Sequence, residues 1–233
     1  MKGRCNMRLM MATMVVAACV ATPLRAQDDA TKRLDDAATV FSEVMQSPDK
    51  AIPRDLLTKA HCIAIAPGLK TAAFGVGAKY GKGYLSCRSK GAVGWSAPAA
   101  IRIEGGSVGF QIGGSSTDLI MLVMSEQGAD KLLASQFTVG AQGSAAAGPV
   151  GRTATAQTDA QLRADILSWS RAKGLFAGVA LEGATLRQDL DDNTALYGKK
   201  LENRDIVTKG VRPPAAAAKL ITLLNRYSAL ESK

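Results

Sequence analysis

The segment His61–Gly83, HCIAIAPGLKTAAFGVGAKYGKG, constrains the fold more than any other part of the chain. Apolar residues recur at alternate positions, first Ile63 and Ile65 and then Phe74 and Val76, which predicts β-strands. Repeated glycine weakens an isolated strand, so it marks bulges, tight bends or close approach of another backbone. We therefore expect two strands that turn sharply and pack tightly in a sheet. The glycines are Gly68, Gly75, Gly77, Gly81 and Gly83.

The region around this segment is basic. No aspartate or glutamate occurs between Asp55 and Glu104. The sheet is therefore expected to present positive charge on the surface that its basic side chains reach. The stretch 75–83, GVGAKYGKG, fits no nucleotide phosphate-loop motif, but a lysine in it could contact a lipid phosphate as a point charge. A purely structural strand is the alternative. The basic residues are Lys59, Lys70, Lys79, Lys82, Arg88, Lys90 and Arg102.

The N-terminus is typical of an export signal. Three basic residues within the first eight positions precede the apolar run Leu9–Ala21, which is too short to span a membrane as a helix of about 20 residues. Cleavage after Ala26 is the favoured interpretation, because the residues before it look like a cleavage region. Alternatively, Val16–Cys19 is similar to a lipobox, and Cys19 would then be lipidated. A buried core helix is a third possibility.

Export alters the meaning of the charge. Residues 1–26 hold four basic and no acidic side chains, so the net charge of +9 becomes +5 after cleavage. We expect 1–26 to be a signal peptide and 27–233 to be a single domain, located in the periplasm or at the outer membrane. The partner expected for a basic exported protein is an anionic membrane surface. Nucleic acid is not expected, because Lys/Arg runs are absent and aromatic residues make up only 5%.

The cysteines predict a disulfide. Outside the export segment only Cys62 and Cys87 remain, and a single pair in an oxidising compartment favours a bond. An antiparallel pair folded around residues 75–77 could bring their Cα atoms within the required distance of about 7 Å. Two buried free thiols are the alternative. His61 is the one histidine of the chain, so a histidine-based metal cluster is excluded, and neither a metal nor another cofactor is expected.

The remaining pattern predicts an α+β fold. Helices are followed by a run of antiparallel strands and then by helices, so we expect a curved antiparallel β-sheet or barrel-like core with N-terminal and C-terminal helices packed on it. Expected helices are 28–47, 53–60, 125–135, a short helix or turn at 188–198, and one opened by Pro213 and Pro214. Expected strands are 94–103, 107–114, 117–124 and a hairpin of 164–174 with 175–186.

Two motifs partly match known functional sites. Ser107 lies in a G-x-S-x-G pattern, but the hydrolase mechanism needs a strand-to-helix turn and a later histidine, and His61 precedes it. A hairpin turn is preferred there. The segment Asp189–Asn193 mimics the start of an EF-hand loop, yet Thr194 and Lys200 occupy the positions that need glycine and glutamate. A surface turn or helix cap is preferred, and cation binding is left open.

Three segments carry a resemblance to the SYLF lipid-binding domain family. They are AIAPGLKTAAFGVGAKYGKGYL (64–85), SVGFQIGGSSTDLIMLVM (107–124) and SRAKGLFAGVALEGATLRQDLDDNTALYG (170–198). The third is the most specific, because KGLFAGV is followed by EGA and a tail formed by Asp189, Asn193 and Tyr197. The similarity covers about residues 30 to 230. This family has bacterial secreted members and eukaryotic members linked to phosphoinositides and actin.

The resemblance implies a non-enzymatic lipid-binding protein of the bacterial cell envelope. Together with the charge pattern it predicts contact with anionic phospholipid through Lys70, Lys79, Lys82 and Arg88. Actin is not an expected partner of a chain with a bacterial-type export signal. The alternatives are a serine-type hydrolase using Ser107 and a structural envelope protein. No residue is predicted to be catalytic in the favoured interpretation.

Overall fold

The computed structural model describes residues 21–47, 51–88, 94–149, 164–172, 175–177 and 183–228. Within these ranges, the side chains of 21–24, 73–76, 107–112 and 175–177 are not described. The helices are α2 (Ala21–Gln46), α3 (Arg54–Lys59), α4 (Glu126–Leu132), α6 (Leu190–Tyr197), α7 (Asn203–Thr208), the 3-10 turn η1 (Ala215–Ala217) and α8 (Ala218–Ser228). The strands are β1 (Cys62–Cys87), β2 (Ala99–Val123), β3 (Gln136–Thr138), β4 (Ala145–Ala147), β5 (Ile166–Ala172), β6 (Leu175–Ala177) and β7 (Thr185–Gln188).

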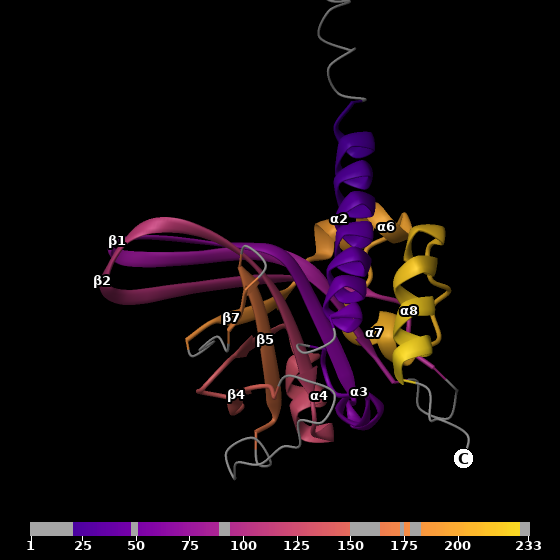
Figure 1. Ribbon diagram of the computed structural model, residues 1–233. Coiled ribbons are helices and arrows are strands. Elements are labelled where there is room, and N and C mark those ends of the chain that lie inside the picture. Colours follow the sequence, from indigo (N-terminus) through magenta and orange to yellow (C-terminus); the bar gives the residue numbers. More distant parts are fainter. Residues whose placement is uncertain are drawn as a thin grey trace, which may run out of the picture.

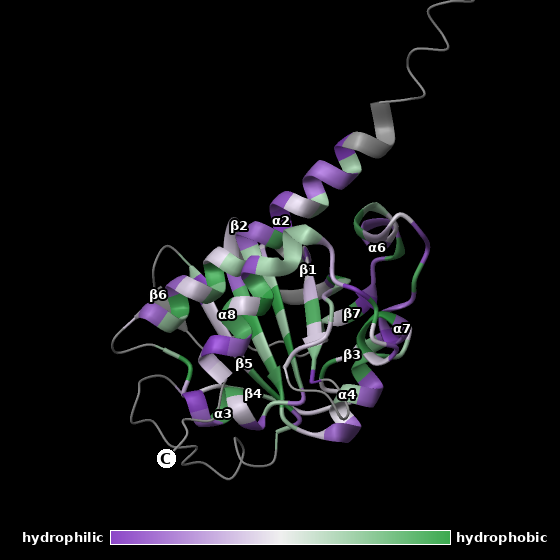
Figure 2. Cartoon of the chain, turned by 90° about the vertical axis from the view of Figure 1, so that its right-hand side faces the viewer, coloured by the Kyte–Doolittle hydropathy of each residue, from purple (hydrophilic) through white to green (hydrophobic). Residues whose placement is uncertain are grey.

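Within the described ranges, the strands form one curled sheet of seven strands (Figure 1). The order is β3-β7-β2-β5-β4, with β1 paired to β2 and β6 paired to β5. The long helix α2 and the C-terminal helix α8 lie against one face, in front of the apolar strands in Figure 2. The predicted α+β class, with a curved sheet and helices from both ends of the chain, is confirmed.

Alternation along the strands gives the sheet two buried faces. Ile63 and Ile65 of β1 belong to the core that α2 and α8 cover. Their neighbours Cys62 and Ala64 belong to a second core, to which α4 and α7 contribute. Because successive side chains of a strand point to opposite faces, a run of consecutive buried residues indicates a sheet that is covered on both sides. The helices on the first face also contact each other, since Phe41 of α2 meets a tyrosine of α8 edge-on at 5.9 Å.

Strand β1 folds back on itself, as the glycine pattern predicts. The backbone N–H of Arg88 donates to the carbonyl of His61 at 2.8 Å, and a disulfide joins Cys62 to Cys87, whose Cα atoms lie 3.9 Å apart. The two halves touch backbone to backbone near Gly83. The sharp bend, the close approach and the disulfide are therefore all present.

The prediction of three separate strands between residues 94 and 124 is wrong. Strand β2 continues through both glycine pairs, with Gly106 opposite Ala78 and Gly113 opposite Ala73. The pairing shifts register near the middle, where Val108 and Ile112 flank the irregularity. The reason is that β1 supplies a partner along nearly all of β2, so the glycines allow bends within a continuous ladder instead of ending it.

Smaller corrections concern three other elements. Helix α2 begins at Ala21, seven residues before the predicted start, so Asp28 and Asp29 lie inside the helix. Strand β4 runs parallel to β5, whereas every strand was expected to be antiparallel. Helix α7 was not predicted, because its six residues are too few for a helical period to stand out. The helices at 53–60, 125–135, 188–198 and after Pro214 are confirmed, with shifted ends.

Removing the disulfide is expected to destabilise the domain. The bond closes a loop with a sequence separation of 25 residues, and chain entropy predicts a loss of about 3 kcal/mol for the Cys62→Ala, Cys87→Ala double variant. The measurement is urea unfolding followed by circular dichroism, compared with unreduced wild type. Alkylation of the freshly isolated wild type without reductant should label neither cysteine. Two labelled thiols, or equal unfolding midpoints, would contradict this prediction.

Candidate lipid-contacting surface

Two of the predicted lysines, Lys70 and Lys79, lie on β1 on either side of its bend. Lys70 is exposed opposite Ser116 of β2, and Lys79 is half-buried opposite Gly105. A Cβ atom on Gly81 would contact Leu69 in the other half of β1. Because Lys70 follows Leu69 and Lys79 precedes Gly81 by two residues, the two lysines lie at the same level of the long ribbon that β1 forms with β2. Tyr80, next to Lys79, is a large side chain that remains 50% exposed.

Lys82 instead belongs to a buried ionic network. Its ammonium nitrogen lies 2.8 Å from a carboxylate oxygen of Asp189 and 2.9 Å from one of Asp192. Arg33 of α2 also pairs with Asp192. Burial alone would lower the pKa of Lys82, but the hydrogen bonds and charges of the two carboxylates outweigh it and raise the pKa. Lys82 therefore lies in a segment without acidic residues but is paired with acids that α6 supplies.

A tyrosine completes this network. The hydroxyl of Tyr84 donates to the backbone carbonyl of Ala30 in α2 at 2.6 Å. Burial and the negative charge of Asp192 raise the pKa of Tyr84, so its phenol stays neutral and can donate. Through Arg33, Lys82 and Tyr84, the helices α2 and α6 are fastened to β1.

Arg88 is likewise engaged within the fold. Its guanidinium donates to the backbone carbonyls of Leu57 at 3.1 Å and Thr58 at 3.4 Å, close to the C-terminus of α3. It also lies over the ring of Trp95, 4.3 Å from the ring centroid. Burial lowers the pKa of Arg88. Because its guanidinium is held by the carbonyls at the end of α3 and by the ring of Trp95, Arg88 is poorly placed to contact a ligand as well.

The residues Asp189 and Tyr197, from the tail of the third SYLF-like segment, stabilise helix α6. Asp189 caps α6, because its side chain accepts from the backbone N–H of Asp192 at 3.1 Å. The preferred interpretation as a helix cap is confirmed. The hydroxyl of Tyr197 donates to the carbonyl of Pro98 at 2.6 Å, so the end of α6 is fixed beside the start of β2. Among the described residues, no group of three or more His, Cys, Asp or Glu side chains is arranged to hold a metal ion.

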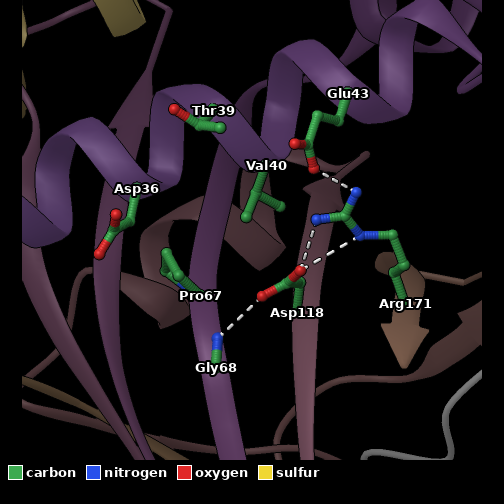
Figure 3. Close-up of a pocket in the computed structure, with 8 residues that line it drawn as sticks. All are labelled: Asp36, Thr39, Val40, Glu43, Pro67, Gly68, Asp118 and Arg171. Carbon is green, nitrogen blue, oxygen red and sulfur yellow. Dashed lines mark hydrogen bonds and ion pairs between the residues drawn. The ribbon is translucent and has the colours of Figure 1, made fainter. Parts of the chain in front are cut away.

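A pocket of about 370 Å³ lies between α2 and the sheet (Figure 3). Arg171 of β5 reaches across it, donating to Asp118 at 2.8 Å and pairing with Glu43 of α2. The backbone N–H of Gly68 donates to the other oxygen of Asp118 at 3.0 Å. The pocket is lined by Asp36, Thr39, Val40, Glu43, Pro67, Gly68, Asp118 and Arg171.

The charges of this pocket oppose an anionic ligand. Three carboxylates line it against one guanidinium, and both carboxylate partners already occupy Arg171. A phosphate entering it would meet net negative charge without a free cation in the lining. Sequence reasoning missed this ion-paired group, because its members are separated by many residues and none belongs to a recognisable motif. The pocket is therefore not a candidate site for an anionic ligand.

Two predicted residues cannot be placed fully. Ser107 lies on β2 opposite Gly77, with strand on both sides instead of the strand-to-helix turn of a hydrolase, and its side chain is outside the described part of the chain. Cys19 and most of the predicted export segment also lie outside it. Where the structure is described, no helix is both long and apolar enough to cross a membrane.

The fold defines a class of protein: a small α+β domain with one curled sheet, helices from both ends of the chain and a half-exposed tyrosine on its longest strand. Residues 104–227 match the Ysc84 family, described as "Las17-binding protein actin regulator". The chain belongs to this family, which agrees with the SYLF motifs in its sequence.

Relatives extend the similarity to most of the chain. It is 31% identical over 191 residues to "SH3 domain-containing YSC84-like protein 1" of Rattus norvegicus, which covers 81% of this chain and 56% of the relative. It is 34% identical over 181 residues to "LAS seventeen-binding protein 3" of Saccharomyces cerevisiae, covering 76% of this chain and 39% of that relative. An SH3 domain-containing protein of Schizosaccharomyces pombe is 36% identical over 199 residues, 83% of this chain and 46% of its own length. The chain thus spans about half the length of these relatives.

Proposed function

We propose that this domain binds anionic phospholipid through the outer part of β1, without catalysing a reaction. The observation that carries the proposal is that Lys70, Lys79 and Tyr80 lie at one level of β1, with Lys70 and Tyr80 on one face and Lys79 on the other. The nearest acid on the paired strand, Glu104, is opposite Tyr80 and lies 3.0 Å from Arg102, so its charge is compensated. The local field on this surface therefore favours anions.

The expected affinity is modest. Each basic side chain near an anionic membrane contributes about 1 kcal/mol, so two lysines give weak, reversible binding. Lys82 and Arg88 add little, because the ion pairs and carbonyl contacts described above already occupy them. Such attraction between exposed charges is screened at physiological ionic strength, where the Debye length is about 8 Å.

A charge reversal tests the proposal. The Lys70→Glu, Lys79→Glu double variant should sediment with vesicles of one part phosphatidylglycerol to three parts phosphatidylcholine at least tenfold less than wild type, at low salt. The matched control is Lys199→Glu, Lys200→Glu, which changes the net charge equally at exposed positions after α6. Wild-type binding should weaken as salt is raised. Equal binding to neutral and anionic vesicles, or equal losses in both double variants, would refute the role of this surface.

Binding of a protein partner is the second candidate function. It is favoured by the family description and by the name of the yeast relative, both of which state Las17 binding. Two proteins that share a domain do not necessarily bind the same partner. The relatives are also about twice as long as this chain. Co-sedimentation of the purified protein with filamentous actin, in the same buffers as the vesicle assay, separates this candidate from the first.

We also propose that the protein acts after export, at the cell envelope. The N-terminal charge pattern followed by an apolar run supports this, and so does a disulfide between Cys62 and Cys87, since such bonds persist in oxidising compartments. The lipids available there would include the anionic phospholipids that the first proposal requires.

A further inference from the structure

Two arginines lie directly opposite each other on neighbouring strands. Arg102 of β2 pairs with Arg187 of β7, and the same row continues to Lys82 on β1. The adjacent residues Ile103 and Leu186 belong to the second core, so the two arginines point to the opposite face of the sheet. Like charges directly opposite each other destabilise an antiparallel pair, so negative charge beside these arginines is stabilising.

One carboxylate supplies part of this negative charge. Glu104 has one oxygen 3.0 Å from Nε of Arg102 and the other 3.6 Å from Nε of Arg187. Within the described ranges, it is the acid that both guanidiniums contact. The neighbouring Lys82 adds no free charge, because carboxylates of the α6 region already pair with it. Two guanidiniums that share one carboxylate keep an excess of positive charge.

The outer ends of the two guanidiniums remain able to donate. The side chains of Arg102 and Arg187 are 37% and 41% exposed. Their Nε atoms, which face Glu104, are buried and make no hydrogen bond within the described part of the chain, whereas their Nη atoms are not buried. Glu104 therefore positions the inner edges of both groups and leaves the Nη atoms for another acceptor. Two planar forks side by side suit an anion with several oxygens.

The free donors fit a phosphate monoester better than a diester. A monoester carries roughly −1.5 to −2 charges at pH 7 and three strong acceptor oxygens, whereas a diester has a single charge and two free oxygens. Tyr80 lies opposite Glu104 on β1 and is 50% exposed, so the arginine pair adjoins the surface proposed above to contact lipid. This position favours the head group of a lipid over a phosphorylated peptide.

We propose that Arg102 and Arg187 bind the phosphate monoester head group of an anionic lipid, of the kind that phosphatidic acid carries. The inference rests on the proposed lipid binding, and it names the head group and the residues that recognise it. The Nη atoms of both arginines donate to the phosphate oxygens, while Glu104 keeps the two guanidiniums in position. A lysine attracts any anion as a point charge, whereas this pair selects the head group by its geometry.

Vesicle selectivity tests the inference. Wild type should bind phosphatidylcholine vesicles that contain phosphatidic acid roughly tenfold more tightly than phosphatidylglycerol vesicles of the same electrophoretic mobility. The Arg102→Lys, Arg187→Lys double variant keeps the charge but loses the planar forks, so it should bind both kinds of vesicle equally. The matched control is Arg212→Lys, Arg226→Lys, at exposed positions outside these strands, and it should keep the preference. Circular dichroism checks that each variant is folded. A preference that is absent in wild type, or retained in the first double variant, would overturn the inference.

A second measurement on wild type separates this site from vesicle binding. Soluble dihexanoyl phosphatidic acid should shift the NMR signals of the Nε–H groups of Arg102 and Arg187 more than inorganic phosphate does at the same concentration. If these signals shift but the protein binds no vesicles, the proposed function fails while the arginine site stands. Equal shifts with inorganic phosphate would identify a site for free phosphate, and tighter binding of a phosphoserine peptide would identify a protein partner. Either result would overturn the lipid assignment, and unshifted signals with every probe would overturn the site.

Discussion

Replacing Gly83 by alanine is expected to destabilise the domain by about 4 kcal/mol or more, which is a large part of the stability of a typical domain. A Cβ atom at this position would lie 2.2 Å from the carbonyl oxygen of Ile65 and 2.7 Å from the Cα atom of Ala66. Both are backbone atoms of the other half of β1, so no side chain can rotate away to make room. Relief would require the two halves to separate, close to the disulfide and between the two buried cores.

The matched control for this substitution is Gly106→Ala. The nearest atom to a Cβ at Gly106 is the carbonyl oxygen of Gly77, 3.9 Å away, which is an ordinary contact. Gly106→Ala also replaces a glycine within a strand by alanine. The two variants therefore differ mainly in the space around the added methyl group. Urea unfolding should show a large loss for Gly83→Ala and a change within about 1 kcal/mol for Gly106→Ala. Equal midpoints for the two variants would show that the halves of β1 can move apart at little cost.

The glycine pattern was informative because its meaning is local. Repeated glycine in an apolar alternation predicts a bend with close backbone contact, and Gly81 and Gly83 lie at such contacts. The pairing of Cys62 with Cys87 followed from the same bend and from the absence of other cysteines downstream. Each inference used residues that are near in sequence or few in number, so tertiary structure had little freedom to change the result.

The candidate site was harder to predict, because its electrostatics depend on distant residues. Lys82 lies in a segment without acidic residues, yet Asp189 and Asp192 reach it from α6, more than a hundred positions later. The group formed by Asp118 and Arg171 beneath α2 was missed for the same reason. The sequence gives the number of basic residues in a segment, but only the fold shows which of them are paired with acids.

That distinction also focuses the function. Helix α6 neutralises Lys82, and the end of α3 contacts Arg88, whereas Lys70 and Lys79 lie on either side of the bend of β1. The segments that hold the domain together and the segment proposed to meet lipid are therefore different parts of one strand. A substitution that unfolds the domain should be distinguishable from one that only impairs binding.

The Asn193→Ala variant is expected to lose about 3 to 5 kcal/mol of stability. Asn193 is fully buried, and its carbonyl oxygen accepts from the backbone N–H of Ala100 at 2.7 Å. Its amide group donates to the carbonyl of Leu201 at 3.0 Å and to the side chain of Asn203 at 2.8 Å. Alanine would leave these partners without their hydrogen bonds in a site that excludes water, and unsatisfied buried groups are destabilising by about 1 to 3 kcal/mol each.

The exposed neighbour Thr194 supplies the control. Its hydroxyl donates to the carbonyl of Leu190 within α6, so Thr194→Ala removes a local hydrogen bond of the same helix and should change stability by less than about 1 kcal/mol. Thermal and urea unfolding of both variants provide the comparison. Since Asn193 fixes α6 to β2, its loss should also loosen Asp189 and Asp192 from Lys82, and hydrogen exchange at β1 should then increase near that residue. Wild-type stability in Asn193→Ala would show that the ion pairs of α6 and the hydrogen bond of Tyr197 suffice to hold the helix.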